Sequence, residues 1–410
     1  MKKLLLVLLI LSLFINHLNA NEKDLQIIQK DKKEYRLLDK ESIQTRQQSQ
    51  KYDWISPIDL SGNIGRNHSF SDENSRNLNN KNTKSASIGF TQSIFESGGI
   101  GFKMDYADNR FKYEMLSWEN QNSQLIYTIY NTLLDIKKLK LEINQNDYRI
   151  VNKDIELIIK KIQYEAGKTD IIELNNAIMS KNLILKEEIA LKNSLKEKEQ
   201  ELAKYTDLKY DEIEILDFQE TNKDIFLDKN YSILEADAKV EMLNSEYKIK
   251  KSQYLPKLSL SAKASYSNQD EKFNSMISDT NKDDASSSGS LILSMPLYDY
   301  TKSSKIQESK IEVLKQKALV NDLKNETAFE YEQIFTKIDT YLKQNETINK
   351  NIKLYEELIG ANKISSEAGM TSKYDLEILE NTKTINEFDI LINKINILQQ
   401  YAKLYFKIKN

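Results

Sequence analysis

The chain has 410 residues and is almost electrically neutral, with 59 Lys and Arg against 62 Asp and Glu, so its charge indicates neither a nucleic-acid partner nor an anionic membrane surface. It has no Cys and only two His, His17 and His68, which excludes disulfides and thiolate catalysis and argues against an enzyme, a metal site or a cofactor. The presence of only 10 Gly and 3 Pro indicates few, long elements.

Residues 1–20 are typical of a secretory signal peptide. Lys2 and Lys3 form a basic start, an apolar run extends over residues 4–15, and Ala20 is the small residue before the expected cleavage site. The alternative is a membrane anchor, but the apolar run is too short, because a spanning helix needs roughly 20 apolar residues. The cleavage position stays open, because Leu18 is larger than the residue usually found there.

Each half of the chain contains two stretches in which apolar and polar residues alternate, which is the period of a strand with one apolar and one wet face. We expect strands at about 57–66 and 86–96, and again at about 256–267 and 288–298, each pair joined by a polar loop. A lone hairpin is at best marginally stable in water, so these hairpins need further strands or a membrane. Their apolar positions are Ile58, Leu60, Gly62, Ile64, Ile88, Phe90, Ile94, Leu258, Leu260, Ala262, Ala264, Tyr266, Leu291, Leu293, Met295 and Leu297.

Long helices are expected at about 100–165 and 301–366, and shorter return helices at about 170–205 and 371–406. A repeat of apolar residues every seven positions predicts a narrow seam between packed helices, and about 65 residues would extend roughly 100 Å. The repeat comprises Ile136, Ile143, Ile150, Leu157 and Tyr164 in the first long helix, and Tyr341, Ile348 and Tyr355 in the second.

The long helices end at matching turns, where Gly167 and Gly369 are expected to supply left-handed caps. The return helices have candidate N-caps in Thr169 or Asp170 and in Thr371 or Ser372. The whole pattern occurs twice at a steady offset, since Pro57 and Pro256 lie 199 residues apart. The sequence therefore predicts a tandem duplication, with a first repeat over 21–225 and a second over 226–410.

These motifs, doubled in the same order behind a signal peptide, resemble the TolC family of outer-membrane efflux proteins over nearly the whole mature chain. The resemblance rests on Leu-Pro-x-Leu-x-Leu-x-Ala at 255–262, Pro-Leu-Tyr-Asp at 296–299, its weaker twin at 94–99, and the two glycine turns. It implies a mainly α fold with a β-barrel portion. Three copies would form one 12-stranded barrel in the outer membrane and a long α-helical barrel in the periplasm.

The resemblance also implies a passive exit duct of a tripartite efflux pump or a type I secretion system. Its expected partners are two further copies in a homotrimer, a periplasmic adaptor, an inner-membrane transporter and outer-membrane lipid. The alternative is a periplasmic coiled-coil adaptor or structural protein without a membrane barrel, which the heptads and the signal would fit equally well. The sequence does not indicate what is exported or which class of transporter takes part.

The turns carry the residues that the resemblance implies for gating and docking. Asp375 matches an acid that narrows the periplasmic entrance, Glu173 matches an acid of a closing tether, and Asp170 is a candidate substitute acid. For Asp170 and Asp375 the alternative role is helix capping. The expected adaptor contacts at the tip are Gly167, Lys168, Gly369 and Met370.

The chain departs from the family pattern at three positions of this gate. The second narrowing acid is replaced by Ile378, and the tether's Tyr and Arg positions hold Ser366 and Thr371. The closing tether is therefore in doubt. At the ends of the expected strands, Phe95, Tyr298 and Tyr300 are expected either as an interfacial aromatic girdle or as residues packed against the helices.

Overall fold

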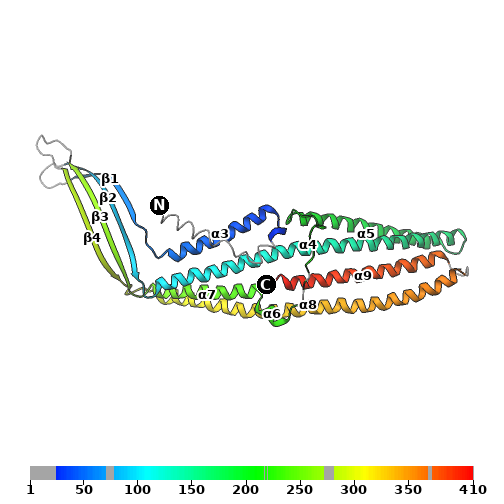
Figure 1. The fold of residues 1–410 in the computed structure, drawn as a ribbon. Coiled ribbons are helices and arrows are strands. Elements are labelled where there is room, and N and C mark those ends of the chain that lie inside the picture. The colour runs from blue at the N-terminus through cyan, green and yellow to red at the C-terminus, as the bar shows by residue number, and fades with distance from the viewer. Residues whose placement is uncertain are drawn as a thin grey trace, which may run out of the picture. The chain divides into compact units, whose positions relative to one another are not determined.

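The computed structural model describes residues 25–70, 78–216, 218, 220–271, 281–367 and 372–409, so the expected signal peptide lies outside the described residues. The described chain is mostly helical with one small sheet (Figure 1). Its elements in order are η2 Leu25–Ile27, α3 Lys30–Tyr52, β1 Asp59–Phe70, β2 Leu78–Phe95, α4 Gly99–Glu165, α5 Ile171–Ala203, α6 Lys223–Asp228, α7 Tyr231–Ser252, β3 Lys257–Glu271, β4 Asn281–Ser294, α8 Lys302–Glu367 and α9 Lys373–Tyr405.

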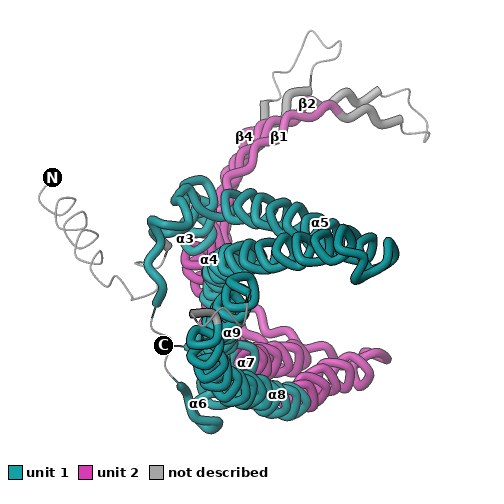
Figure 2. The backbone as a smooth tube through the Cα atoms, turned by 90° about the vertical axis from the view of Figure 1, so that its right-hand side faces the viewer, with its two compact units in different colours: residues 1–40, 116–234, 321–410 teal, residues 41–115, 235–320 magenta. Residues whose placement is uncertain are grey.

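The chain divides into two compact units, each of which draws on both halves of the sequence (Figure 2). Unit 1 comprises residues 1–40, 116–234 and 321–410 and holds the helical turns. Unit 2 comprises residues 41–115 and 235–320 and holds the sheet. The tandem duplication stays a prediction, although the long helices α4 and α8 have 67 and 66 residues and the return helices α5 and α9 have 33 each.

The helices of unit 1 lie side by side in the order α5, α4, α9, α8 (Figures 1 and 2). Polar side chains connect each neighbouring pair. Asn146 of α4 donates to the Ile184 carbonyl of α5 at 3.4 Å, and Gln145 of α4 donates to Asp389 of α9 at 2.7 Å. Asn393 of α9 donates to Asn345 of α8 at 2.9 Å. Within the described residues, no helix combines the length and the apolar character that crossing a membrane requires.

The α8 helix buries only a narrow seam, as the heptad pattern predicts. Ile334 and Ile338 are buried, and the next inward positions follow at alternating spacings of three and four residues, with mostly exposed residues between them. These partly buried positions are Tyr341, Asn345, Ile348, Ile352, Tyr355 and Ile359. On α4 the predicted seam starts at fully buried Ile136 and ends at Tyr164, which is 42% exposed.

One buried hydrophobic cluster of unit 1 lies where α6 and the end of α9 meet α8. Its five buried members are Phe226, Ile334, Ile338, Leu404 and Ile408. A neighbouring aromatic cluster places Phe218 against Tyr130, Tyr405 and Phe406, with ring centroids 5.5 to 5.9 Å apart. Phe218, which precedes α6, and Phe226, which lies within α6, are therefore both buried in unit 1.

The sheet of unit 2 has four antiparallel strands in the order β1-β2-β3-β4. The two hairpins of the chain are joined by the pairing of β2 with β3, in which Ile88 lies opposite Ala264. The strands extend further toward their loops than expected, because the Asn, Ser and Lys residues there continue the ladder. At its other end β4 stops at Ser294, two residues before Pro296, which has no N–H to donate.

Candidate functional site

One face of the sheet is apolar and open. The pairing register gathers the predicted apolar positions of all four strands on this face, which we call the apolar face: Leu60, Ile64, Ile88, Phe90, Leu258, Leu260, Ala262, Ala264, Tyr266, Leu291 and Leu293. Leu60 is 80% exposed, Ile64 83% and Leu293 73%. Exposed apolar residues that gather in one contiguous patch indicate a partner or a lipid surface.

The opposite face is lined by hydroxyl groups, and we call it the hydroxyl face. Cross-strand oxygen pairs join Ser61 to Ser87 and Ser265 to Ser286, each at 2.8 Å. Two further pairs join Thr91 to Ser261 at 3.0 Å and Ser93 to Ser259 at 3.3 Å. Such pairs align neighbouring strands and keep the face polar. The predicted division into an apolar and a wet side therefore runs across the whole sheet.

A β-bulge marks the helix-proximal end of the apolar face. The register of β2 against β3 shifts between Ser93 and Phe95, so that Phe95 lies opposite Leu258. The bulge takes up Ile94 as the extra residue, so Ile94 has no Cα partner on β3 and its expected place on the apolar face stays a prediction.

The side chain of Gln92 fixes the segment that leads into β1. Its amide nitrogen donates to the Trp54 carbonyl at 2.9 Å, and its oxygen accepts from the Ser56 N–H at 2.9 Å. Gln92 thereby satisfies two backbone groups at the point where the β1 ladder ends. Sequence reasoning missed this residue, because a polar residue in an alternating strand carries no sign of such a role.

The predicted interfacial aromatics lie near the helix-proximal end of the sheet. Phe95 ends β2 and is 52% exposed. Tyr298 and Tyr300 follow the end of β4 rather than lying within it, and they are 84% and 87% exposed, so neither is packed against helices of its own chain. Sequence reasoning counted Tyr266 only as an apolar position. It lies toward the loop end of the apolar face, where its hydroxyl bonds to Asp283.

The turn between α4 and α5 has the predicted glycine cap. Gly167 has a positive φ of 67°, its N–H donates to the Tyr164 carbonyl at 2.9 Å, and the Lys168 N–H donates to the Gln163 carbonyl at 2.8 Å. These two bonds form a Schellman motif, which satisfies the last carbonyls of the helix. The predicted tip residues Gly167 and Lys168 are both exposed to solvent.

The three candidate gate acids all have local partners. Asp170 caps α5 by accepting from the Glu173 N–H at 2.9 Å, and the Glu173 carboxylate forms an ion pair with Lys160 at 2.9 Å. Asp375 completes a capping box with Ser372, whose N–H donates to it at 3.3 Å. These roles match the capping alternative and leave the gate role of the acids a prediction. The other two tip residues, Gly369 and Met370, lie outside the described residues.

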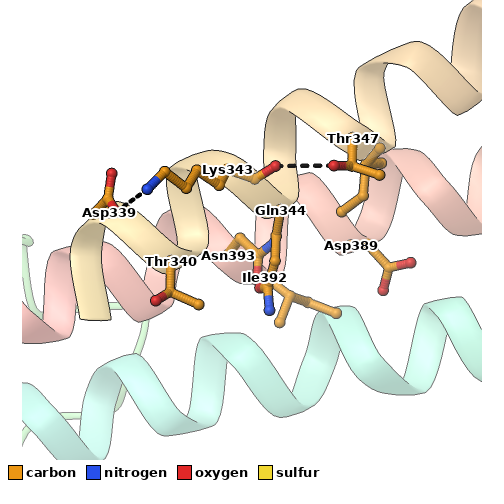
Figure 3. Close-up of a pocket in the computed structure, with 9 residues that line it drawn as sticks. Asp339, Thr340, Lys343, Gln344, Thr347, Asp389, Ile392 and Asn393 are labelled. Atoms are coloured by element: carbon orange, nitrogen blue, oxygen red, sulfur yellow. Dashed lines mark hydrogen bonds and ion pairs between the residues drawn. The ribbon is translucent and has the colours of Figure 1, made fainter. Parts of the chain in front are cut away.

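A polar groove of about 600 Å³ interrupts the seam between α8 and α9 (Figure 3). Thr340, Gln344 and Thr347 line it from α8, while Asp389 and Asn393 line it from α9. Between Tyr341 and Ile348 the inward position of the seam is the polar Asn345. No cluster of acidic, His or Cys side chains suited to a metal ion occurs within the part of the chain that the structure describes.

Part of the chain matches the sequence model of a known protein family. Residues 224–403 match the sequence model of the outer membrane efflux protein family. The resemblance drawn from the sequence motifs is thereby confirmed. A comparison with curated protein sequences gave no match.

Solved structures share the fold at low sequence identity. The outer membrane protein VceC of Vibrio cholerae has a TM-score of 0.71 and 12% identity, covering 93% of this chain and 94% of that one. The Campylobacter jejuni outer membrane channel CmeC has a TM-score of 0.69 and 13% identity, covering 93% and 86%. The open state of the Neisseria gonorrhoeae outer membrane channel MtrE has a TM-score of 0.66 and 11% identity, covering 94% and 88%.

Proposed function

We propose that three copies of this chain form a channel across the outer membrane that extends into the periplasm. The channel is the passive exit duct of a tripartite efflux pump or a type I secretion system. The observation that carries the proposal is the apolar face, whose Leu and Ile side chains are exposed across four strands. Contact with lipid hydrocarbon removes these side chains from water, which lowers the free energy of the protein.

The need for several copies follows from the unpaired sheet edges. The order β1-β2-β3-β4 leaves β1 and β4 each with one partner among the described strands. In lipid each unsatisfied backbone group costs several kcal/mol, so the sheet must close on itself. The smallest membrane barrels have about eight strands, so four strands from one chain are too few. Several copies that each contribute four strands can form a closed barrel. Three copies would supply the 12 strands that the family resemblance implies.

The two faces of the sheet suit this barrel. With the apolar face toward lipid, the hydroxyl face lines a water-filled pore. Leu258 and Tyr266 lie eight residues apart on β3, or roughly 26 Å at ~3.3 Å per residue, and a strand tilt of about 40° reduces this to a depth of roughly 20 Å, which is most of the ~25 Å apolar band of outer-membrane barrels. Phe95, Tyr298, Tyr300 and Tyr266 are then candidates for the aromatic girdles at the two interfaces.

The helical turns form the periplasmic tip in this proposal. Asp375, with Asp170 and Glu173 beside the other turn, would narrow the entrance when three copies meet. Gly167, Lys168, Gly369 and Met370 would contact a periplasmic adaptor. The energy for export comes from an inner-membrane transporter, and the duct itself performs no chemistry.

The competing function is that of a periplasmic coiled-coil adaptor or structural protein without a membrane barrel. Fractionation of cells that express the full chain separates the two. The duct is expected to stay in the outer membrane until detergent is added and then to migrate as a trimer. Release of a monomer by osmotic shock would reject the duct and favour the adaptor.

A further inference from the structure

The hydroxyl face carries few charges, and two of them lie in one row across the sheet. The row comprises Asp59 on β1, Gly89 on β2, Lys263 on β3 and Ser288 on β4, each paired with the next. Above and below this row the strands present mainly Ser and Thr. Lys263 and Asp59 are both exposed, so each charge is in contact with water.

Gly89 has no side chain, so no side chain of β2 lies between Asp59 and Lys263 in this row. A Cβ atom built at Gly89 would lie 3.3 Å from both Cβ and Cγ of Lys263 and 3.0 Å from the Ala262 carbonyl oxygen. The stem of Lys263 therefore extends over the backbone of β2, in the space that any larger residue at 89 would occupy. Two strand spacings, roughly 10 Å, separate the backbones of Asp59 and Lys263.

The other charges of this face are arranged differently. Lys257, at the base of β3, contributes a positive charge near the carboxylate of Glu96, which also pairs with Lys103 at 2.9 Å. Asp284 lies four residues from Ser288 along β4, or about 13 Å at ~3.3 Å per residue. Of the side chains that the structure describes on this face, only Asp59 and Lys263 set opposite charges at one level.

We propose that Asp59 and Lys263 form a charged belt in the pore wall that sets its preference between anionic and cationic solutes. Lys263 attracts anions and Asp59 attracts cations, so the net charge of the intact belt is close to zero. Rings of charged side chains are the usual means by which pores select ions by sign. The inference rests on the proposed function, because it requires that the hydroxyl face line a water-filled channel.

The test measures ion selectivity of the full-length trimer in planar bilayers under a low-salt gradient. Lys263→Gln should raise the cation-to-anion permeability ratio, and Asp59→Asn should lower it, each by about twofold or more for charges ~10 Å from the ion path. The double variant should return close to the wild-type ratio. Lys84→Gln is the matched control, because it removes the same charge from the apolar side of β2 and should leave the ratio unchanged.

The outcomes separate this inference from the proposed function. A wild-type trimer that conducts while both single variants keep its permeability ratio would overturn the belt and leave the duct intact. Shifts of the same sign in both variants, or an equal shift in the Lys84 control, would also overturn it. A wild-type protein that forms no channels would reject the duct, and the belt with it.

Discussion

Arg36 and Trp118 bind each other's backbone within unit 1. The Arg36 guanidinium donates to the Trp118 carbonyl at 3.0 Å, and the Trp118 indole N–H donates to the Arg36 carbonyl at 2.8 Å. Arg36 is only 8% exposed, and its guanidinium also donates to Asn122 at 2.6 Å, Gln121 at 2.9 Å and Asp39 at 3.4 Å. A buried charge with several acceptors is held firmly in place, so this contact fixes α3 against α4.

Arg36→Ala should therefore release α3. The variant loses the four hydrogen bonds of the guanidinium and leaves the Asn122 oxygen buried without its donor, at a cost of about 2–3 kcal/mol in local stability. Hydrogen exchange of the α3 amides in the detergent-solubilised protein measures this opening. The control is Arg46→Ala, which removes an exposed ion pair with Glu114 and should cost less than about 1 kcal/mol. Equal protection of α3 in both variants would contradict the prediction.

Gly167→Ala tests the left-handed cap at the tip of α4. No atom lies within 4 Å of the added Cβ, so only the backbone conformation at φ 67° opposes the substitution. The expected cost is about 1 kcal/mol, the usual penalty for a left-handed Ala. Faster proteolysis at the turn, with unchanged protection of the α4 centre, is the measurement. Gly101→Ala is the control, because it also has open space but no positive φ, and it should leave cleavage at the tip unchanged.

The polar groove between α8 and α9 predicts an unusual response to apolar substitution. Asn345 and Asn393 bond to each other at seam positions, where a buried amide pair fixes register at a cost in stability. The double variant Asn345→Leu/Asn393→Leu should be as stable as the wild type or up to about 2 kcal/mol more stable, because both partners are replaced together. Asn393→Leu alone should destabilise by about 1 kcal/mol, because Asn345 loses its donor. Heat-induced loss of helicity, measured for the wild type, Asn345→Leu, Asn393→Leu and the double variant as a double-mutant cycle, decides whether the two residues are coupled or independent.

The sequence predicted the long elements because their signals are local. The scarcity of Gly and Pro, together with the heptad of α8, gave helix bounds close to those observed. The loop-side ends of the strands were harder to predict. The polar residues just before Lys84 are typical of a loop, but their backbones continue the ladder with β1. Contacts between residues far apart in the chain left no recognisable pattern in the sequence. Arg36 and Gln92 look like ordinary surface residues until the fold brings Trp118 and Trp54 beside them.

Asp375→Asn tests the proposed gate. If three Asp375 carboxylates converge at the entrance, the variant should lose cation selectivity and block by divalent cations in a planar bilayer, because like charges on an axis attract cations. Asn can still accept the Ser372 N–H bond, so the capping box is not the quantity tested. Asp339→Asn is the control, because it removes the same charge from α8, where Asp339 pairs with Lys343 far along the helix from the turn. Unchanged conductance and block in the Asp375 variant would remove the gate assignment.

Glu330 links α8 to the end of α9 and makes this contact dependent on pH. Burial raises the pKa of Glu330, but the hydrogen bonds and charges of Lys403 and Lys407 outweigh burial and leave the pKa below its ordinary value. Lys403 lies 2.8 Å from the carboxylate. Because the folded pKa is depressed, the stabilisation is complete above the ordinary pKa of about 4.5 and is lost as the pH falls through the folded value.

Glu330→Gln should therefore lower the stability of unit 1 by about 1 kcal/mol at pH 7. The difference from the wild type should shrink as the pH falls below about 4.5, because protonation of the wild-type carboxyl removes the same charge. Thermal unfolding at pH 7 and at pH 3 measures both effects. Glu332→Gln is the control, because its pair with Lys223 is exposed and should contribute less than about 0.5 kcal/mol at either pH. A Glu330 effect that is equal at both pH values would show that packing, and not charge, holds the two helices together.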